Sequence, residues 1–245
     1  ILNKNEISNV YMPFESKPHQ HAIIKTLKEN NKNIKVFGFI HSTLSPLPTD
    51  YFFKKYYEPD KLVANGESQK NILEHHLAWP KKKLMLKNSF RLQKKNKKIF
   101  SNKIFLSYSI GDPNKAFLKI RHLINDILKI KFSFKVINHP FMKYSSSHKK
   151  LIGNINHLKK ISHLKKDNGE SIVVGVSTVI LEILENGKDV FHICEDPIFH
   201  VPSNKIWKKI IVKKVDKGIY HYSLKHKGSL IKFGKKNSFK KSFDI

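Results

Sequence analysis

Residues 173 to 191 have the sequence VVGVSTVILEILENGKDVF, and this stretch predicts the fold. It consists of an apolar strand, the pair Ser177-Thr178, an amphipathic helix that carries Glu182, and another apolar strand after Gly187. Strand–helix–strand runs of this kind are typical of parallel α/β layers. Polar residues at the corner between strand and helix lie where such sheets bind ligands.

The same alternation extends over most of the chain. Strands are expected at 9–12, 34–40, 61–65, 103–109 and 132–138, and helices from about residue 18, from Asp112-Pro113 and over about 148–165. The helix after Asp112-Pro113 has an apolar stripe of 3.6-residue period, made of Ala116, Phe117, Ile120, Leu123, Ile124, Ile127 and Leu128. The sequence therefore predicts an α/β protein with parallel sheets.

The chain is expected to contain two Rossmann-like domains. Residues 91 to 103 contain five lysines and no core pattern, which indicates a linker. We therefore expect an N-terminal domain over 1–91, a linker over 92–102, a second domain over 103–213 and a weakly patterned tail, with at most a short hairpin, over 214–245. The first residue is Ile1 rather than Met, so we expect the N-terminal domain to be incomplete.

The formal net charge of +28 invites a nucleic-acid interpretation. Of the 47 basic residues, however, only Arg91 and Arg121 are arginine, the residue that base readout and bidentate phosphate contacts favour. We therefore expect no nucleic-acid partner, and expect attraction to anionic lipid surfaces or anionic substrates instead. A non-catalytic, basic nucleic-acid-binding α/β protein stays open as an alternative.

Cys194 is the single cysteine, which excludes internal disulfides and fits a reducing compartment. No run reaches the roughly 18 apolar residues that a membrane span needs. These features predict a cytoplasmic protein, with peripheral contact at the inner face of the membrane through its lysines.

Candidate binding residues follow the strands of the second half. They are Gly111, the pair His139-Pro140 and the pair Ser177-Thr178. Backbone N–H groups at the start of a helix favour a phosphate, so Ser177 and Thr178 are predicted phosphate contacts; the alternative is that Ser177 only caps the helix. Glu182, one turn further on, is positioned to accept hydrogen bonds from ribose hydroxyls; the alternative is a solvated helix charge.

Several other sites lose support because their motifs are absent. The chain has no Walker-type loop, no Gly-x-Gly-x-x-Gly and no Gly-x-Ser-x-Gly. The histidine pairs His19/His21 and His75/His76 lack acidic or cysteine partners at the usual metal-ligand spacing. We expect neither a metal nor a resident cofactor.

The order of these motifs resembles GT-B glycosyltransferases, in which two Rossmann-like domains face a cleft. The Ser177-Thr178, Glu182 and Gly187 pattern is similar to their donor-nucleotide segment, and His139-Pro140 is similar to the His-Pro motif of bacterial sialyltransferases and teichoic-acid glycerophosphotransferases. The stretches PFESKPHQHAIIKTLK (13–28), GFIHSTLSP (38–46) and NSFR (88–91) resemble bacterial surface-carbohydrate biosynthesis proteins. The resemblance covers most of the chain.

This resemblance implies a metal-independent transfer of sugar from a CMP-, UDP- or GDP-linked donor to a polysaccharide or glycolipid acceptor. His139 would stabilise the leaving phosphate. The Asp/Glu-Asp/Glu-Gly motif that supplies the base in the sialyltransferases is absent, so Glu15 is the candidate base and His41 the second candidate. A polyol-phosphate transferase with a CDP-linked donor is the alternative enzyme.

Overall fold

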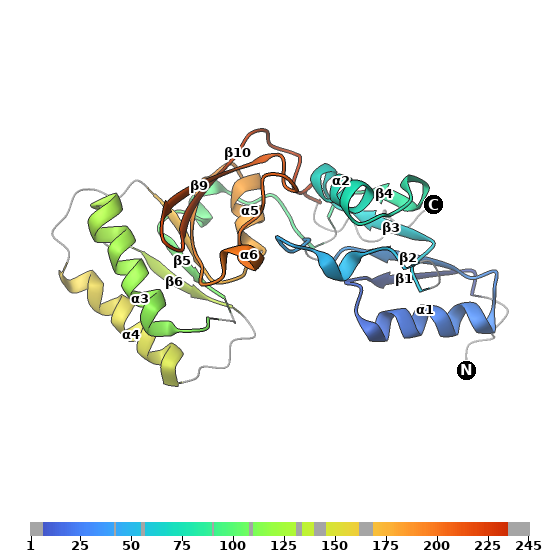
Figure 1. Ribbon diagram of the computed structural model, residues 1–245, viewed down its shortest axis with the longest axis horizontal. Coiled ribbons are helices and arrows are strands. Elements are labelled where there is room, and N and C mark those ends of the chain that lie inside the picture. The colour runs from blue at the N-terminus through green and yellow to red at the C-terminus, as the bar shows by residue number, and fades with distance from the viewer. Residues whose placement is uncertain are drawn as a thin grey trace. The chain divides into compact units, whose positions relative to one another are not determined.

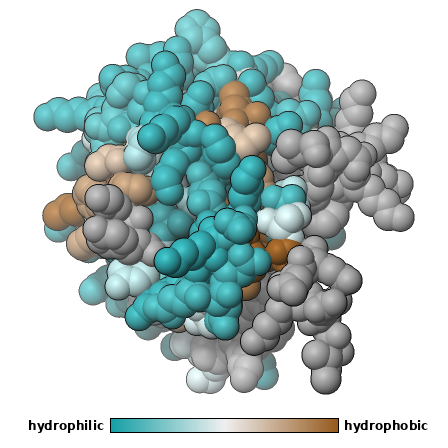
Figure 2. Space-filling model, turned by 90° about the vertical axis from the view of Figure 1, so that its right-hand side faces the viewer, coloured by the Kyte–Doolittle hydropathy of each residue, from teal (hydrophilic) through white to brown (hydrophobic). Residues whose placement is uncertain are grey.

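A computed structural model describes residues 7–41, 43–54, 57–89, 91–107, 110–130, 134–139, 146–161 and 169–234. The chain divides into two compact units, unit 1 (Ile1–Lys94 with Gly228–Ile245) and unit 2 (Lys95–Lys227). In the described parts, every helix is too short or too polar to cross a membrane. The face seen in Figure 2 is mostly hydrophilic, with scattered hydrophobic residues.

Unit 1 contains a four-stranded parallel sheet of order β1-β2-β3-β4. Its strands are β1 (Asn9–Pro13), β2 (Lys35–Phe39), β3 (Lys61–Ala64) and β4 (Leu84–Leu86). Its helices are α1 (Pro18–Asn30) and α2 (Glu67–His76), with 3-10 turns η1 (Thr49–Tyr51) and η2 (Lys81–Lys83) (Figure 1). Strand–helix alternation and parallel pairing confirm the expected α/β class for this half.

The carboxyl end of β1 is fixed by an aromatic cluster. Phe14 is fully buried and makes edge-on contacts with Tyr51 and Trp79. Trp79 Nε1 donates to the carbonyl of Tyr51 at 2.7 Å, and Tyr51 Oη donates to the carbonyl of Phe14 at 3.1 Å. These hydrogen bonds and ring contacts fix the path of the chain directly after β1.

The C-terminal segment 228–234 is part of unit 1. Leu230 and Ile231 are buried, and the backbone of the segment bonds to α2 through Ser68 N to Ser229 O at 2.9 Å. The segment lies so close to Gly66 that a Cβ built there would be 1.9 Å from the carbonyl oxygen of Leu230. Glycine is therefore required at this position by backbone contact.

Unit 2 contains a six-stranded sheet of order β6-β5-β7-β8-β10-β9. Four strands are parallel, namely β5 (Lys103–Leu106), β6 (Lys135–Asn138), β7 (Ser171–Val174) and β8 (Val190–Ile193), and the hairpin β9 (Ile210–Asp216) and β10 (Ile219–Leu224) adds antiparallel strands. The helical elements are η3 (Lys97–Ile99), α3 (Pro113–His122), η4 (Leu123–Leu128), α4 (Ser146–Ile161), α5 (Val179–Glu185) and α6 (Pro197–His200).

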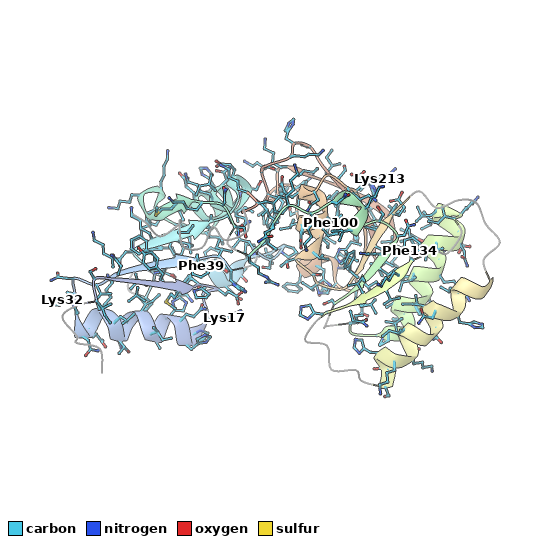
Figure 3. The ribbon with its side chains drawn as sticks, turned by 180° about the vertical axis from the view of Figure 1, so that it is seen from behind. Lys17, Lys32, Phe39, Phe100, Phe134 and Lys213 are labelled. Atoms are coloured by element: carbon cyan, nitrogen blue, oxygen red, sulfur yellow. The ribbon has the colours of Figure 1, made fainter. Side chains whose placement is uncertain are left out.

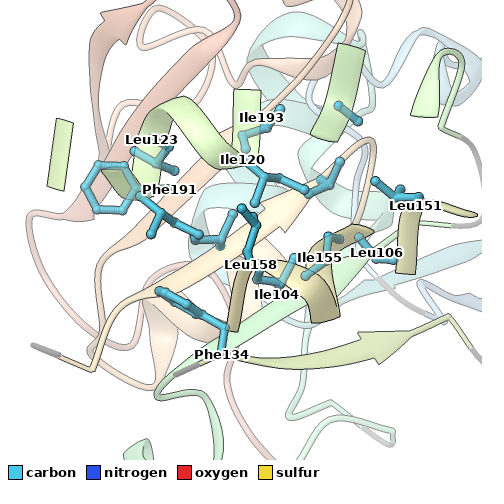
Figure 4. Packing of buried hydrophobic residues seen from close by; sticks show 14 of the residues in the cluster. Ile104, Leu106, Ile120, Leu123, Phe134, Leu151, Ile155, Leu158, Phe191 and Ile193 are labelled. Atoms are coloured by element: carbon cyan, nitrogen blue, oxygen red, sulfur yellow. The ribbon is translucent and has the colours of Figure 1, made fainter. Parts of the chain in front are cut away.

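The two faces of this sheet are covered by different helices. Alternate strand residues such as Ile104, Ile172 and Val174 pack against α3 and α4 (Figure 4). Val173 is buried but points to the opposite face, where α5 lies (Figure 1). The apolar stripe expected after Asp112 is confirmed, because its residues are in this core or packed against it.

His192 of β8 is fully buried on the α5 face. Its Nε2 lies 3.0 Å from the carbonyl oxygen of Gly175, and its Nδ1 lies 2.8 Å from Tyr222 Oη. Because a carbonyl only accepts, Nε2 carries the hydrogen and Nδ1 accepts from the tyrosine. Burial lowers the pKa of His192 to about 4, so the ring is neutral and holds the glycine turn that follows β7.

The division of the chain differs from the expected one in two places. The units separate between Lys94 and Lys95, inside the expected linker 92–102, but this stretch also contains η3 and the buried Phe100. The expected end of the second domain at 213 falls inside β9, which pairs with β10. The expected tail 214–245 therefore includes the end of β9 and all of β10, both in unit 2, and the segment 228–234 of unit 1.

Candidate functional site

The carboxyl ends of the four parallel strands of unit 2 place a row of residues at one edge of the sheet. Leu106 is in register with Asn138 and with Val174, and Val174 is in register with Ile193. The residues that follow, His139, Ser107, Gly175 and Cys194, therefore form the next row. This is the edge at which open α/β sheets bind ligands, here where β6 and β7 lie on opposite sides of β5.

A cavity of about 110 Å³ lies at this edge. It is lined by Ile110 and Gly111 before α3, by the ends of β7 and β8, and by α3 and α6, and its polar or reactive side chains are Lys119, Cys194, Glu195 and His200. Ligand pockets for whole drug-sized molecules have volumes of roughly 300–1,000 Å³, so this cavity holds only a fragment of a nucleotide or sugar. Nδ1 of His200 is buried with no hydrogen-bond partner among the described residues.

Gly111 lines the cavity, as its predicted binding role requires, but a carboxylate of the chain covers it. Glu195 Oε1 accepts from the backbone N–H of Asp112 at 2.7 Å. A Cβ at Gly111 would lie 2.1 Å from Glu195 Oε2. A phosphate at this turn would have to displace Glu195, because two anions cannot share the same N–H group.

Cys194 is not placed to act as a nucleophile at neutral pH. Its side chain is buried, and burial raises the pKa of the thiol to about 11. The ammonium of Lys119 donates to the carbonyl oxygen of Cys194 at 2.9 Å. Since the thiolate is the reactive form, this cysteine is an apolar wall of the cavity.

Ser177 and Thr178 follow β7 at the same edge, before α5. Ser177 Oγ accepts from Val179 N, at the first position of α5, at 3.3 Å, whereas Thr178 occupies the N-cap position of this helix. Thr178 is exposed and makes no side-chain cap. Both hydroxyls remain candidate phosphate contacts by position only.

Glu182 has a partner inside unit 2. Its side chain is 10% exposed, and Oε1 lies 2.6 Å from Nζ of Lys95. The alternative of a solvated helix charge is therefore wrong for Glu182, and Glu185 on the same helix is buried too. A ribose at Glu182 would compete with this ion pair.

His139 directly follows β6 in the row of edge residues, and its side chain is partly exposed. The strand that it follows is next to β5, and His139 lies at the edge that also carries Gly175 and the cavity. Pro140, the other half of the predicted His-Pro motif, lies outside the described residues.

Glu15 stands on a fixed turn after β1. Gln20 Oε1 accepts from Glu15 N at 2.8 Å and from Lys17 N at 3.1 Å, and Gln20 Nε2 donates to the carbonyl of Pro13 at 3.0 Å. Ser16 has a φ of 56°, an uncommon conformation for a residue other than glycine. The side chain of Gln20 therefore fixes the backbone of this turn through three hydrogen bonds.

Ser16 is fixed by a histidine of α1. Its Oγ lies 3.0 Å from His21 Nε2, while His21 Nδ1 donates to the carbonyl of Tyr57 at 2.9 Å. The hydroxyl therefore donates to Nε2. Both side chains are buried, so this pair holds the turn that presents Glu15.

The carboxylate of Glu15 has no hydrogen-bond or ion-pair partner among the described residues, although it is only partly exposed. Burial and, second to it, the negative charge of Glu15 raise the pKa of Tyr51, so the two side chains are neighbours. His41 follows β2, the adjacent strand, at the same edge and is exposed. The structure therefore brings both candidate bases to one edge of the unit 1 sheet.

Glu58 is a buried carboxyl that the sequence did not single out. It is 5% exposed, accepts from Lys54 N at 3.2 Å, and burial raises its pKa to about 7. It precedes β3 at the amino edge of the sheet, away from the edge that binds ligands in this class. We therefore interpret it as a structural group.

Glu58→Gln is expected to stabilise unit 1 at pH 8. The raised pKa means that the folded state holds the proton more tightly, so the contribution of Glu58 is favourable below about pH 4.5 and is lost as the pH rises through about 7. The variant should gain about 1–2 kcal/mol at pH 8 by urea unfolding, and this gain should shrink towards pH 5. A gain that is equal at both pH values would contradict this assignment.

Comparison with protein-family models, with curated proteins and with solved structures found no match. Lys119 and His200 are candidate site residues that the sequence did not indicate. Lys119 lies on the polar side of a helix whose apolar stripe was recognised, and His200 follows the Glu195-Asp196 pair by a single turn. In the described part of the chain, no group of three or more His, Cys, Asp or Glu side chains is placed to hold a metal ion.

Proposed function

We propose that the chain is a GT-B-like glycosyltransferase that moves a sugar from a nucleotide-linked donor to a polysaccharide or glycolipid acceptor. The observation that carries the proposal is the carboxyl edge of β5–β8: His139 follows β6, Ser177 and Thr178 follow β7, and a cavity with an unpaired histidine nitrogen among the described residues lies at the ends of β7 and β8. A fixed glutamate without a partner among the described residues, Glu15, supports a base on unit 1.

The chemistry follows from these residues. An inverting transfer needs a base, for which Glu15 is the candidate, to take the proton of the acceptor hydroxyl while the oxygen attacks the anomeric carbon. The bond between that carbon and the donor phosphate breaks, and the nucleotide leaves with the electron pair. His139 and Lys119 supply N–H groups and positive charge on the phosphate side. Glu195 must give up Asp112 N–H if the phosphate takes that turn.

A nucleotide screen tests the donor site. Unfolding of unit 2 is followed by fluorescence of Trp207 in a Trp79→Phe background, because these are the two tryptophans and each lies in a different unit. We expect one of CMP, CDP, UDP and GDP, and not ATP, to raise the melting temperature by about 5 °C or more when it is in large excess.

The shift should be lost in His139→Ala and in His200→Ala. It should be kept in His157→Ala, which changes an exposed histidine on α4. A shift with CDP alone would favour the polyol-phosphate transferase. If no nucleotide shifted the melting temperature, the proposed donor site would be overturned. The same holds if the shift were lost equally in all three variants.

A further inference from the structure

The segment 197–214, from α6 into β9, exposes large hydrophobic side chains. Ile198 and Phe199 of α6 are 75% and 57% exposed, the two highest values among the described large hydrophobic residues. Ile211 of β9 is 46% exposed. Packing among the described residues does not explain two adjacent exposed apolar residues on one helical turn.

These side chains project from an ordered scaffold. Asp196 caps α6 by accepting from Ile198 N at 3.0 Å, and Pro197 occupies its first position. Trp207 is 1% exposed, and its backbone N–H donates to the carbonyl of Ser203 at 2.7 Å. The segment is thus anchored by its buried tryptophan while its apolar residues face solvent.

The same segment is strongly basic. It contains five lysines and neither aspartate nor glutamate, and all five are exposed: Lys205, Lys208, Lys209, Lys213 (labelled in Figure 3) and Lys214. Lysines on the edge strand β9 also discourage pairing with another chain. That role gives no reason for Ile198 and Phe199 to be exposed on α6.

We infer that residues 197–214 are a docking surface for an anionic lipid bilayer. Lysines are attracted to anionic headgroups, and exposed Ile and Phe side chains enter the boundary between headgroups and acyl chains. A nucleic acid would engage the lysines but offers no apolar layer to exposed aliphatic side chains such as Ile198 and Ile211. The inference does not depend on the proposed transfer reaction, because it requires no donor.

Co-sedimentation with vesicles tests the surface, using the whole chain. We expect binding to vesicles of three parts phosphatidylcholine and one part phosphatidylglycerol, and little binding to pure phosphatidylcholine. Raising the salt from about 0.1 M to about 1 M shortens the Debye length from about 10 Å to about 3 Å and should release most of the protein. Lys205→Ser/Lys208→Ser/Lys209→Ser should lower the partition coefficient about a hundredfold.

A charge-matched control separates this surface from net charge. Lys32→Ser/Lys81→Ser/Lys82→Ser removes three exposed lysines of unit 1 and should weaken binding far less. Ile198→Ser/Phe199→Ser should lower binding about tenfold without changing the charge, whereas Ile23→Ser/Phe52→Ser, at two residues each 48% exposed, should not.

Equal losses in the two lysine variants, or no effect of Ile198→Ser/Phe199→Ser, would overturn the inference. So would binding to a single-stranded oligonucleotide with no binding to anionic vesicles. Far-UV circular dichroism of each variant checks that the substituted chain is folded.

Discussion

Acidification from pH 7 to pH 4 is expected to remove on the order of 3 kcal/mol from the unfolding free energy of unit 2 through His192 alone. The folded state keeps this ring neutral, with a pKa of about 4, while the unfolded chain takes up a proton below about pH 6.5. The unfolded state therefore binds more protons between these values. The stabilising contribution is complete above about pH 6.5 and is lost as the pH falls towards 4.

His192→Gln isolates this effect. The variant should be less stable than the wild type at pH 7, by about 1–3 kcal/mol, because Gly175 O and Tyr222 Oη lose a partner. Its stability should nevertheless vary less between pH 6.5 and pH 4. Urea unfolding followed by Trp207 fluorescence in the Trp79→Phe background gives the slope, and His157→Gln is the exposed control. An unchanged slope in His192→Gln would show that other groups dominate the acid response.

The central elements of the fold could be predicted from the sequence because their side chains repeat with the period of the local structure. The stripe from Ala116 to Leu128 predicted α3 and η4, and apolar runs predicted β1, β2 and β3 close to their observed ends. The π-helical geometry of η4 and the short strand β4 left no local pattern. The β9–β10 hairpin was hard to recognise because β9 is an edge strand, where Lys213 and Lys214 need not alternate with apolar residues.

The edge that carries the candidate site could also be predicted, since the carboxyl ends of parallel strands meet there. The hydrogen-bond and ion-pair partners of its side chains could not be predicted. Glu195 bonds to Asp112, 83 residues away, and Glu182 pairs with Lys95 from the stretch expected to be a linker. Such contacts depend on tertiary packing, which a window of sequence does not contain. For the same reason, the sequence did not show that Gly66 must be glycine, because the residue in contact with it, Leu230, lies near the far end of the chain.

Gly66→Ala is expected to destabilise unit 1 by about 3 kcal/mol, because the added methyl would lie 1.9 Å from the carbonyl oxygen of Leu230. That oxygen accepts from Gln69 Nε2 at 2.8 Å, and nearby Ser89 N donates to Lys232 O at 2.7 Å. Neither backbone segment can retreat without breaking these bonds. The segment 228–234 should therefore detach, exposing Leu230 and Ile231.

Urea unfolding followed by Trp79 fluorescence in a Trp207→Phe background measures the loss, and trypsin should cleave after Lys232 faster than in the wild type. Gly153→Ala is the matched control, because nothing lies within 4 Å of its added methyl. Gly153 is inside α4, where alanine forms helix better than glycine, so this variant should gain about 0.5–1 kcal/mol. Because Gly153 belongs to unit 2, the gain in stability should be seen when unfolding is followed by Trp207 fluorescence in the Trp79→Phe background. The transition followed by Trp79 fluorescence in the Trp207→Phe background should not change. If Gly66→Ala left both stability and cleavage at wild-type values, the segment 228–234 would not be packed on α2 in solution.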